Sequence, residues 1–180
     1  MSLLNLPHLR SGLRVAAIVG IALGLSACLR PLHGPTVSGA SLQNVLASID
    51  IPDKEWPDSQ AVVGHYLRSE LIYAFNGSGS DTPKKYNLKL ALTERLSTPI
   101  VDSVSGRAQS ATLIGNLKYT LTSLDGKTVV TTGTATGQAT YDRFNQRFAT
   151  VRAARDAEIR LAKTLAEQVK TRIAATLSQM

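Results

Sequence analysis

The sequence predicts an α+β fold, a two-layer sandwich in which two helices pack on one face of a four-stranded, mostly antiparallel sheet. Three observations lead to this fold class. Apolar and polar residues alternate through two long segments in the middle of the chain, as in half-buried strands. An Asp-Gly pair then leads into a Thr- and Val-rich segment, which indicates a β-hairpin. Two further segments, before and after these strands, repeat apolar residues at helical spacing.

The first 27 residues differ from the rest of the chain and are typical of a signal peptide. Arg10 and Arg14 give a positive start, and residues 15–25 form an uncharged run. As a helix this run would reach only about half of a ~30 Å hydrocarbon core. Its length instead fits the apolar region of a signal peptide, so we expect residues 1–27 to be removed.

The residues before the only cysteine match the lipobox that the lipoprotein signal peptidase cuts. Leu25, Ser26 and Ala27 precede Cys28, which would carry a diacylglycerol and an N-acyl chain. Several acyl chains together anchor a protein stably to a membrane. Leu29 stands where an acidic residue would favour retention at the inner membrane, so delivery to the outer membrane is expected. The alternative is an ordinary secretory signal followed by a buried cysteine.

The mature chain begins with a flexible segment and then enters a single domain. Residues 28–43 contain two Pro and two Gly without a period and are predicted to be a lipidated tether, with the domain at 44–180. The short apolar-rich run 45–51 is predicted to be the first strand. A helix is predicted at 59–75, with Asp58 as its N-cap.

Three strands are predicted to follow that helix. Residues 86–98 alternate cleanly, and residues 99–107 form a loop or an irregular edge. The second strand covers 111–124, the hairpin turn is Asp125-Gly126, and the returning strand covers 128–141.

The period becomes helical again at residues 148–177, which are predicted to be the second helix. Gly133 and Gly137 interrupt the returning strand, where glycine indicates a bulge or a close approach of backbone. With both helices on one face, the other face of the sheet would be open, Thr-rich and suited to contact with another protein or with water. Its predicted side chains are Lys89, Thr93, Lys118, Thr120, Thr132 and Thr134.

No motif for catalysis, for a metal or for a cofactor stands out, so we expect a protein that is not an enzyme. His33 and His65 have no partner at metal-ligand spacing, and no G-x-S-x-G elbow is present. Trp56, Tyr66 and Tyr73 are predicted to belong to the core. Removal of Arg10 and Arg14 would lower the formal net charge from +7 to +5, which suits an anionic partner. Nucleic acid is not expected as that partner, because the chain is predicted to be exported and lacks a long basic run.

Several regions resemble the alphaproteobacterial branch of the LptE family of lipopolysaccharide-assembly lipoproteins. The segment after the cysteine reads C-L-R-P-L-H-G, similar to the family's C-G-F-x-P-L-Y-G, although it is one residue shorter and has Leu29 and His33 where Gly and Tyr are usual. The long hairpin between residues 86 and 141 is a second similarity. The third is a series leading into the C-terminal helix: Tyr141-Asp142, Phe148-Ala149, Ala153, Arg155-Asp156-Ala157 and Leu165-Ala166.

The resemblance implies an outer-membrane lipoprotein that faces the periplasm and fills the lumen of the LptD β-barrel, in a heteromer that places lipopolysaccharide in the outer leaflet. Lipopolysaccharide carries phosphates and carboxylates, which Lys and Arg bind. Basic residues near predicted loops are candidate contacts: Lys84, Lys85, Arg107 and Lys127. They could equally be solvated charges at strand ends. The alternative function is an independent periplasmic lipoprotein that binds lipid or peptidoglycan without a barrel.

Overall fold

The computed structural model describes residues 36, 39–77, 79, 81–98, 101 and 106–179. The predicted signal peptide, the lipobox and Cys28 lie outside these residues, as do most of the tether expected at 28–43 and most of the segment 99–107. The described residues belong to one compact unit, 35–180. Among their helices we find none that combines the length and the apolar character needed to cross a membrane.

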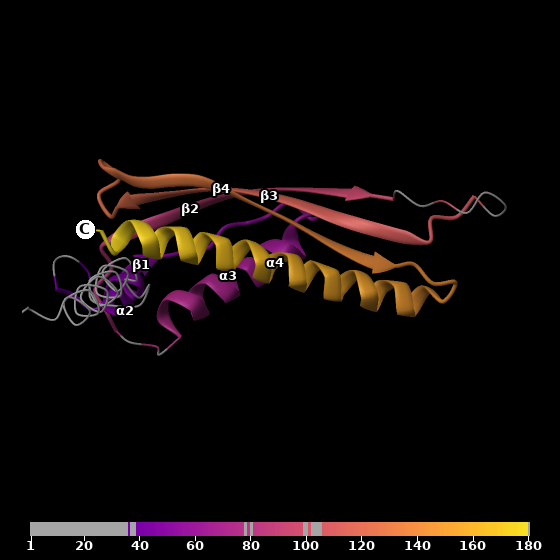
Figure 1. The fold of residues 1–180 in the computed structure, drawn as a ribbon, viewed down its shortest axis with the longest axis horizontal. Coiled ribbons are helices and arrows are strands. Elements are labelled where there is room, and N and C mark those ends of the chain that lie inside the picture. Colours follow the sequence, from indigo (N-terminus) through magenta and orange to yellow (C-terminus); the bar gives the residue numbers. More distant parts are fainter. Residues whose placement is uncertain are drawn as a thin grey trace, which may run out of the picture. The chain divides into compact units, whose positions relative to one another are not determined.

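Four strands form one sheet, and their order in space follows their order in the chain (Figure 1). They are β1 (Ile49–Asp50), β2 (Tyr86–Ser97), β3 (Ser110–Ser123) and β4 (Val129–Asp142). The pairs β2–β3 and β3–β4 are antiparallel, whereas β1 runs parallel to β2. The three long strands confirm the predicted ones, and the sheet is mostly antiparallel as expected.

Leucines at alternate positions build the inner face of the sheet. Leu88 and Leu92 of β2 are buried, as are Leu117 and Leu121 of β3. Side chains on the other face are mostly polar, and Thr pairs run across it, including Thr112–Thr140 at 2.9 Å and Thr120–Thr132 at 3.3 Å. The Thr-rich open face predicted from the sequence is therefore present.

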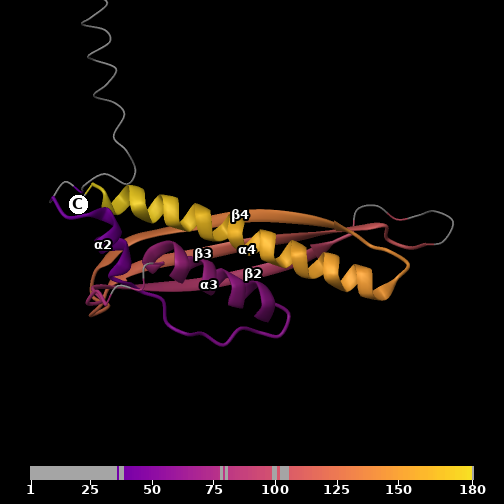
Figure 2. The same cartoon turned by 90° about the horizontal axis from the view of Figure 1, so that it is seen from below.

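Both long helices cover the leucine face (Figures 1 and 2). α4 (Arg147–Leu177) lies along β3 and β4, and α3 (Ala61–Asn76) packs beside α4. The buried side chains of α3 recur at helical spacing, and so do those of α4 from Ala157 onward. This arrangement confirms the two-layer α+β sandwich.

Glycines in the strands allow side chains to approach the sheet closely. Gly115 lies opposite Gly137 in the β3–β4 register, and a Cβ atom on either would lie 3.1 Å from a methyl group of Leu161 of α4. A Cβ atom on Gly133 would lie 2.5 Å from the Tyr119 hydroxyl. The glycines of β4 therefore mark close approach, and the register shift between β3 and β4 lies nearer the hairpin.

The segment predicted to be the first strand is part helix and part strand. Residues 45–47 belong to α2 (Leu42–Ala47), and only Ile49–Asp50 forms a strand. Leu42 and Leu46 are both buried, and their spacing of four places them on one side of a helix turn. The strand prediction is wrong for residues 45–47, because with Leu42 placed in the tether too few residues remain to reveal a helical period, and it is confirmed for Ile49–Asp50.

The start of α3 differs from the prediction as well. The helix follows Gln60, and the side chain of Asp58 caps nothing; only its backbone carbonyl accepts a bond, from the Ala61 N–H at 3.4 Å. Trp56 and Tyr66 pack against the core as predicted, but Tyr73 is 75% exposed. Tyr73 lies outside the buried face of α3. That face is formed by Val63, Gly64, Leu67, Leu71 and Phe75.

The predicted β-hairpin joins β3 and β4. The Ser123 N–H donates to the Thr128 carbonyl at 2.9 Å, and Gly126 adopts φ +71°. Asp125 accepts hydrogen bonds from the Ser123 hydroxyl and from the Lys127 N–H, and these bonds lower the pKa of its carboxyl group. The Asp-Gly signal therefore identified the turn correctly, because glycine tolerates the left-handed conformation that the turn requires.

Candidate functional site

The end of the sheet farthest from the hairpin combines exposed aromatic rings with arginines. β2 and β4 finish there, β3 begins there, and α4 starts after a short connection from β4. α4 and the sheet continue past the start of α3 at this end, so fewer side chains cover them (Figure 2). We call this region the arginine end and define it by Arg107, Arg143, Phe144, Arg147 and Phe148.

Backbone and side-chain hydrogen bonds fix the connection from β4 to α4. The Arg143 N–H donates to the Gln109 carbonyl at 2.8 Å and extends the β3–β4 ladder. The Thr150 hydroxyl receives the Phe144 N–H at 2.9 Å and donates to the Phe144 carbonyl at 3.0 Å. These bonds fix the backbone of the connection, and the side chains of Phe144 and Phe148 are exposed to solvent.

Three arginines and four apolar side chains line an open hollow of about 1060 Å³ at this end. Arg107 donates to the Asn145 side-chain oxygen at 3.1 Å, which joins the start of β3 to the β4–α4 connection. The described lining residues include three arginines and no acidic residue. The lining residues are Thr98, Val101, Gly106, Arg107, Ala108, Gln109, Arg143, Phe144, Asn145, Arg147, Thr150 and Val151.

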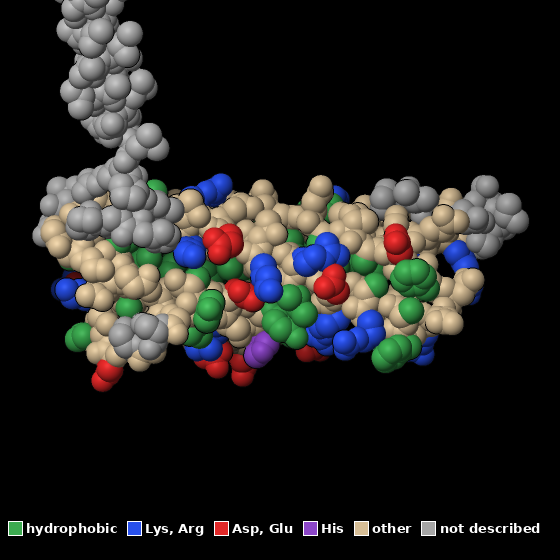
Figure 3. All heavy atoms as spheres, turned by 60° about the horizontal axis from the view of Figure 1, so that its bottom comes forward, with side chains coloured by type: hydrophobic (Ala, Val, Ile, Leu, Met, Phe, Trp, Pro, Cys, Tyr) green, Lys and Arg blue, Asp and Glu red, His purple; other side chains and the backbone are tan. Residues whose placement is uncertain are grey.

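Large apolar side chains are unusually exposed around the hollow. Phe148 is 78% exposed, Val151 56% and Phe144 55%, and Leu96 at the end of β2 is 53% exposed. Val151 is exposed although the apolar spacing of 148–177 includes it, because α4 extends past the start of α3 here. Figure 3 shows Lys and Arg side chains beside hydrophobic ones toward this end. Cations beside apolar groups suit an amphiphile with anionic groups.

Two carboxylates lie on the inner face near the arginine end. Burial raises the pKa of Glu94 of β2, and the negative charge of Glu158 of α4 raises it further. Burial also raises the pKa of Glu158, while Arg155, 3.7 Å away, opposes that shift. One carboxylate oxygen of Glu94 is buried without a hydrogen-bond partner. A buried carboxylate without a hydrogen-bond partner lowers the stability of the fold, and a cation placed next to it would reduce that cost.

The four cations predicted to contact lipopolysaccharide do not form one site. Lys84, Lys85 and Lys127 lie at the hairpin end of the sheet, whereas Arg107 lies at the opposite end. Lys84 has a structural role, because its ammonium group donates to the carbonyls of Ala47 at 2.9 Å and Ile49 at 3.1 Å. Only Arg107 of the four belongs to the arginine end.

Arg143 and Arg147 are not among the predicted site residues, although the sequence contains a signal for them. Residues 143–148 read R-F-N-Q-R-F, two Arg-Phe pairs four residues apart at the start of the second helix. Apolar rings next to arginines in a connection should have indicated an exposed amphipathic surface.

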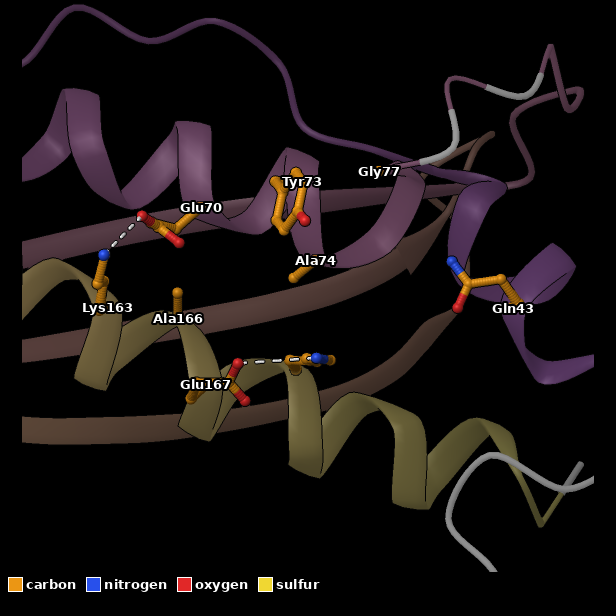
Figure 4. A pocket seen from close by; sticks show the side chains of 9 residues that line it. Gln43, Glu70, Tyr73, Ala74, Gly77, Lys163, Ala166 and Glu167 are labelled. Carbon is orange, nitrogen blue, oxygen red and sulfur yellow. Dashed lines mark ion pairs between the residues drawn. The ribbon is translucent and has the colours of Figure 1, made fainter.

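A second hollow lies between α3 and α4 and has a different character (Figure 4). Its volume is about 430 Å³, and its charged side chains neutralise one another. Lys163 lies 3.9 Å from Glu70, and Lys170 lies 3.7 Å from Glu167. Because each lysine of this hollow is paired with a glutamate, these four side chains together carry no net charge. Within the described ranges, no cluster of three or more His, Cys, Asp or Glu residues could hold a metal.

Comparison with known proteins decides the family. The model of the family LptE, described as lipopolysaccharide-assembly, matches residues 46–173. The chain belongs to the LptE family. The match covers both long helices almost completely and all of the sheet, so the resemblance seen in the sequence is confirmed.

Two solved structures of lipoproteins are similar to this chain, and the first of them shares its fold. A lipoprotein of Caulobacter crescentus CB15 has a TM-score of 0.62 and 23% sequence identity, covering 77% of this chain and 97% of that one. The rare lipoprotein B of Shewanella oneidensis has a TM-score of 0.45 and 13% identity, covering 71% of this chain and 96% of that one. No curated protein sequence matches this chain.

Proposed function

We propose that this protein is an outer-membrane lipoprotein that assists lipopolysaccharide transport and assembly as the plug partner of the LptD β-barrel. Membership of a lipopolysaccharide-assembly family supports the role. The observation that carries the proposal is the arginine end, where Arg107, Arg143 and Arg147 line one hollow next to exposed Phe144. Lipopolysaccharide carries both phosphates and hydrocarbon chains, which the arginines and the exposed phenylalanine of this surface can contact, respectively.

The arginine end offers two kinds of contact to such an amphiphile. A guanidinium group binds a phosphate through two parallel hydrogen bonds, which an ammonium group cannot do. Hydrogen bonds to charged groups contribute about 1.5–3 kcal/mol each. The rings of Phe144 and Phe148 can cover hydrocarbon next to the phosphates.

The open sheet face supports the barrel partner. It is polar and exposed at Lys89, Thr93, Lys118 and Thr134, and hydroxyl groups run across it in pairs. The lumen of a large outer-membrane barrel is polar. A flat hydroxyl-rich face can therefore make many neutral hydrogen bonds to such a wall without burying apolar surface.

Attachment to the membrane through Cys28 completes the proposal. A diacylglycerol and an N-acyl chain on this cysteine would anchor the protein after removal of residues 1–27. Leu29, which is not acidic, favours delivery to the outer membrane. Replacing Cys28→Ala should release the protein from membranes, and fractionation of cells would detect the change.

Binding of purified lipopolysaccharide to charge-reversed variants tests the arginine end. The double variant Arg143→Glu and Arg147→Glu should weaken binding by at least about tenfold, since two charge-assisted contacts become repulsive. The matched control is Lys85→Glu with Lys127→Glu, which changes the net charge equally at the opposite end of the sheet and should have less than about a twofold effect. Equal weakening by both pairs would mean general charge attraction and would contradict the assignment.

Affinity purification of the lipidated protein from outer membranes in mild detergent tests the partner. A stoichiometric large β-barrel should co-purify and resist dissociation. Recovery of the folded protein alone would favour the alternative, an independent lipoprotein that binds lipid or peptidoglycan.

A further inference from the structure

The backbone groups at the β4 edge of the sheet have hydrogen-bond partners on α4, whereas most of those at the β2 edge have no neighbouring strand. Side chains of α4 bind the outward backbone groups of β4. Arg160 donates to the Thr140 carbonyl at 2.9 Å, and Arg172 donates to the Thr134 carbonyl. The side-chain amide of Gln168 makes the two hydrogen bonds that a neighbouring strand would make with Thr136. Its nitrogen donates to the Thr136 carbonyl at 2.7 Å, and its oxygen accepts from the Thr136 N–H at 3.3 Å. The edge of β4 is therefore closed to further pairing.

The edge of β2 is open over most of its length. β1 pairs only with Tyr86 and Asn87, and among the described residues no other strand pairs with β2 on that side. The Lys54 ammonium group donates to the Leu90 carbonyl at 3.0 Å and covers that one position. Beyond Leu90, nothing in the described part of the chain covers the edge with a backbone ladder.

The contacts at either side of β2 show which residues face outward. The Lys85 carbonyl accepts from the Leu124 N–H on the side of β3, whereas the Leu90 carbonyl points away from β3 to Lys54. Backbone groups of an antiparallel strand alternate in direction along the chain. The N–H and C=O groups of Leu92, Glu94 and Leu96 therefore point outward from the open edge.

The side chains along this edge have opposite chemistry on the two faces. On the inner face, Leu92 is buried, Leu96 is 53% exposed, and Glu94 between them has a buried carboxylate oxygen without a partner. On the outer face, Lys89 and Arg95 are exposed cations. A neighbouring strand would match both faces with one cation between apolar residues on its inner side and acidic residues on its outer side.

We propose that the edge of β2 from Leu92 to Leu96 receives an extended segment of a partner protein as an additional antiparallel strand, with a basic side chain opposite Glu94 and acidic side chains beside Arg95. Backbone hydrogen bonds would supply affinity, and the alternating charges would select the sequence. A cation opposite Glu94 would satisfy the carboxylate that burial and Glu158 now disfavour. The proposal does not depend on the barrel or on lipopolysaccharide.

Synthetic peptides test the strand geometry on the purified full chain. The probe is a fluorescent heptapeptide, Thr-Val-Asp-Arg-Asp-Val-Thr, and the measurement is fluorescence anisotropy. N-methylation of its Arg and both Val should lower affinity by at least about tenfold, because their N–H groups would face β2. N-methylation of both Asp should change affinity by less than about twofold, because their N–H groups would face solvent. Equal effects of the two sets, or no saturable binding of the parent peptide, would overturn the proposal.

A charge exchange tests the position of the site. Glu94→Lys should lower affinity for the parent peptide by at least about tenfold, and a peptide with Glu in place of its central Arg should bind this variant again. The matched control, Asp81→Lys, makes the same charge change on an exposed residue outside the strands and should leave binding unchanged within about twofold. Failure of the exchanged peptide to restore binding would overturn the proposal. So would a β2-to-β2 dimer of the wild-type protein in sedimentation equilibrium that Glu94→Lys dissociates, since the occupant would then be a second copy.

Discussion

Adding one methyl group at Gly64 should destabilise the protein, although the same change favours an isolated helix. Gly64 lies buried in α3 beneath the indole ring of Trp56. A Cβ atom on it would lie 2.5 Å from the Trp56 Cγ and Cδ2 atoms and 2.6 Å from Cδ1. Carbon atoms pack at about 3.5–4.0 Å, so the ring would have to move by about 1 Å or more.

Two opposing contributions set the magnitude. Alanine is about 1 kcal/mol more favourable than glycine in a helix interior. Overpacking a well-packed site costs about 1–3 kcal/mol. We therefore expect Gly64→Ala to lower the free energy of unfolding by about 1 kcal/mol. In a Trp56→Ala background the ring is absent, and the same change should raise the free energy of unfolding by up to about 1 kcal/mol.

Urea unfolding followed by circular dichroism measures all four proteins of this double-mutant cycle, and the coupling energy should be about 2 kcal/mol. Trp56 is the only tryptophan, so a shift in fluorescence emission of Gly64→Ala reports directly whether the ring has moved. A Gly64→Ala protein that is more stable than wild type, with unchanged emission, would refute the reasoning. Equal effects of the substitution in both backgrounds would do so as well.

Three further perturbations address the sheet and its charges. Gln168→Leu leaves the Thr136 backbone groups without partners, so we expect a loss of about 1–2 kcal/mol of stability and faster hydrogen exchange at the Thr136 amide. Burial raises the pKa of Glu94 above its ordinary 4.5, so the folded protein loses stability as the pH rises through the raised pKa. Glu94→Gln should therefore be more stable than wild type at neutral pH. Thermal unfolding should show this difference disappearing below about pH 4. Lys84→Met removes a donor to two carbonyls around the end of α2, and chemical unfolding should show a loss of about 1–3 kcal/mol.

Periodic signals gave the long elements reliably. The alternation over 86–98 identified β2, the Asp-Gly pair identified the hairpin, and the helical stripe over 148–177 identified α4 within one residue. Each of these signals depends on residues close together in the chain. A long segment contains several repeats of its own period, so one exception, such as exposed Val151, does not change the interpretation.

Short segments and loop residues were predicted less well. The run 45–51 was too short to distinguish a strand from a helix, and the burial of Leu42 and Leu46 against the core decided in favour of α2. Lys84 looked like a loop cation available to a ligand, but its ammonium group lies at two backbone carbonyls distant in sequence. Neither outcome has a local cause that a sequence pattern records.

The sequence by itself determined the long elements and the faces they bury, because the hydrophobic period of a long strand or helix is carried by consecutive residues. Only the tertiary structure decided which charges meet. It brought Arg107 to Arg143 and Arg147 at one end of the sheet and placed Glu94 beside Glu158. It also closed the edge of β4 with side chains of α4 while leaving β2 open, since those contacts depend on how far one element extends past another.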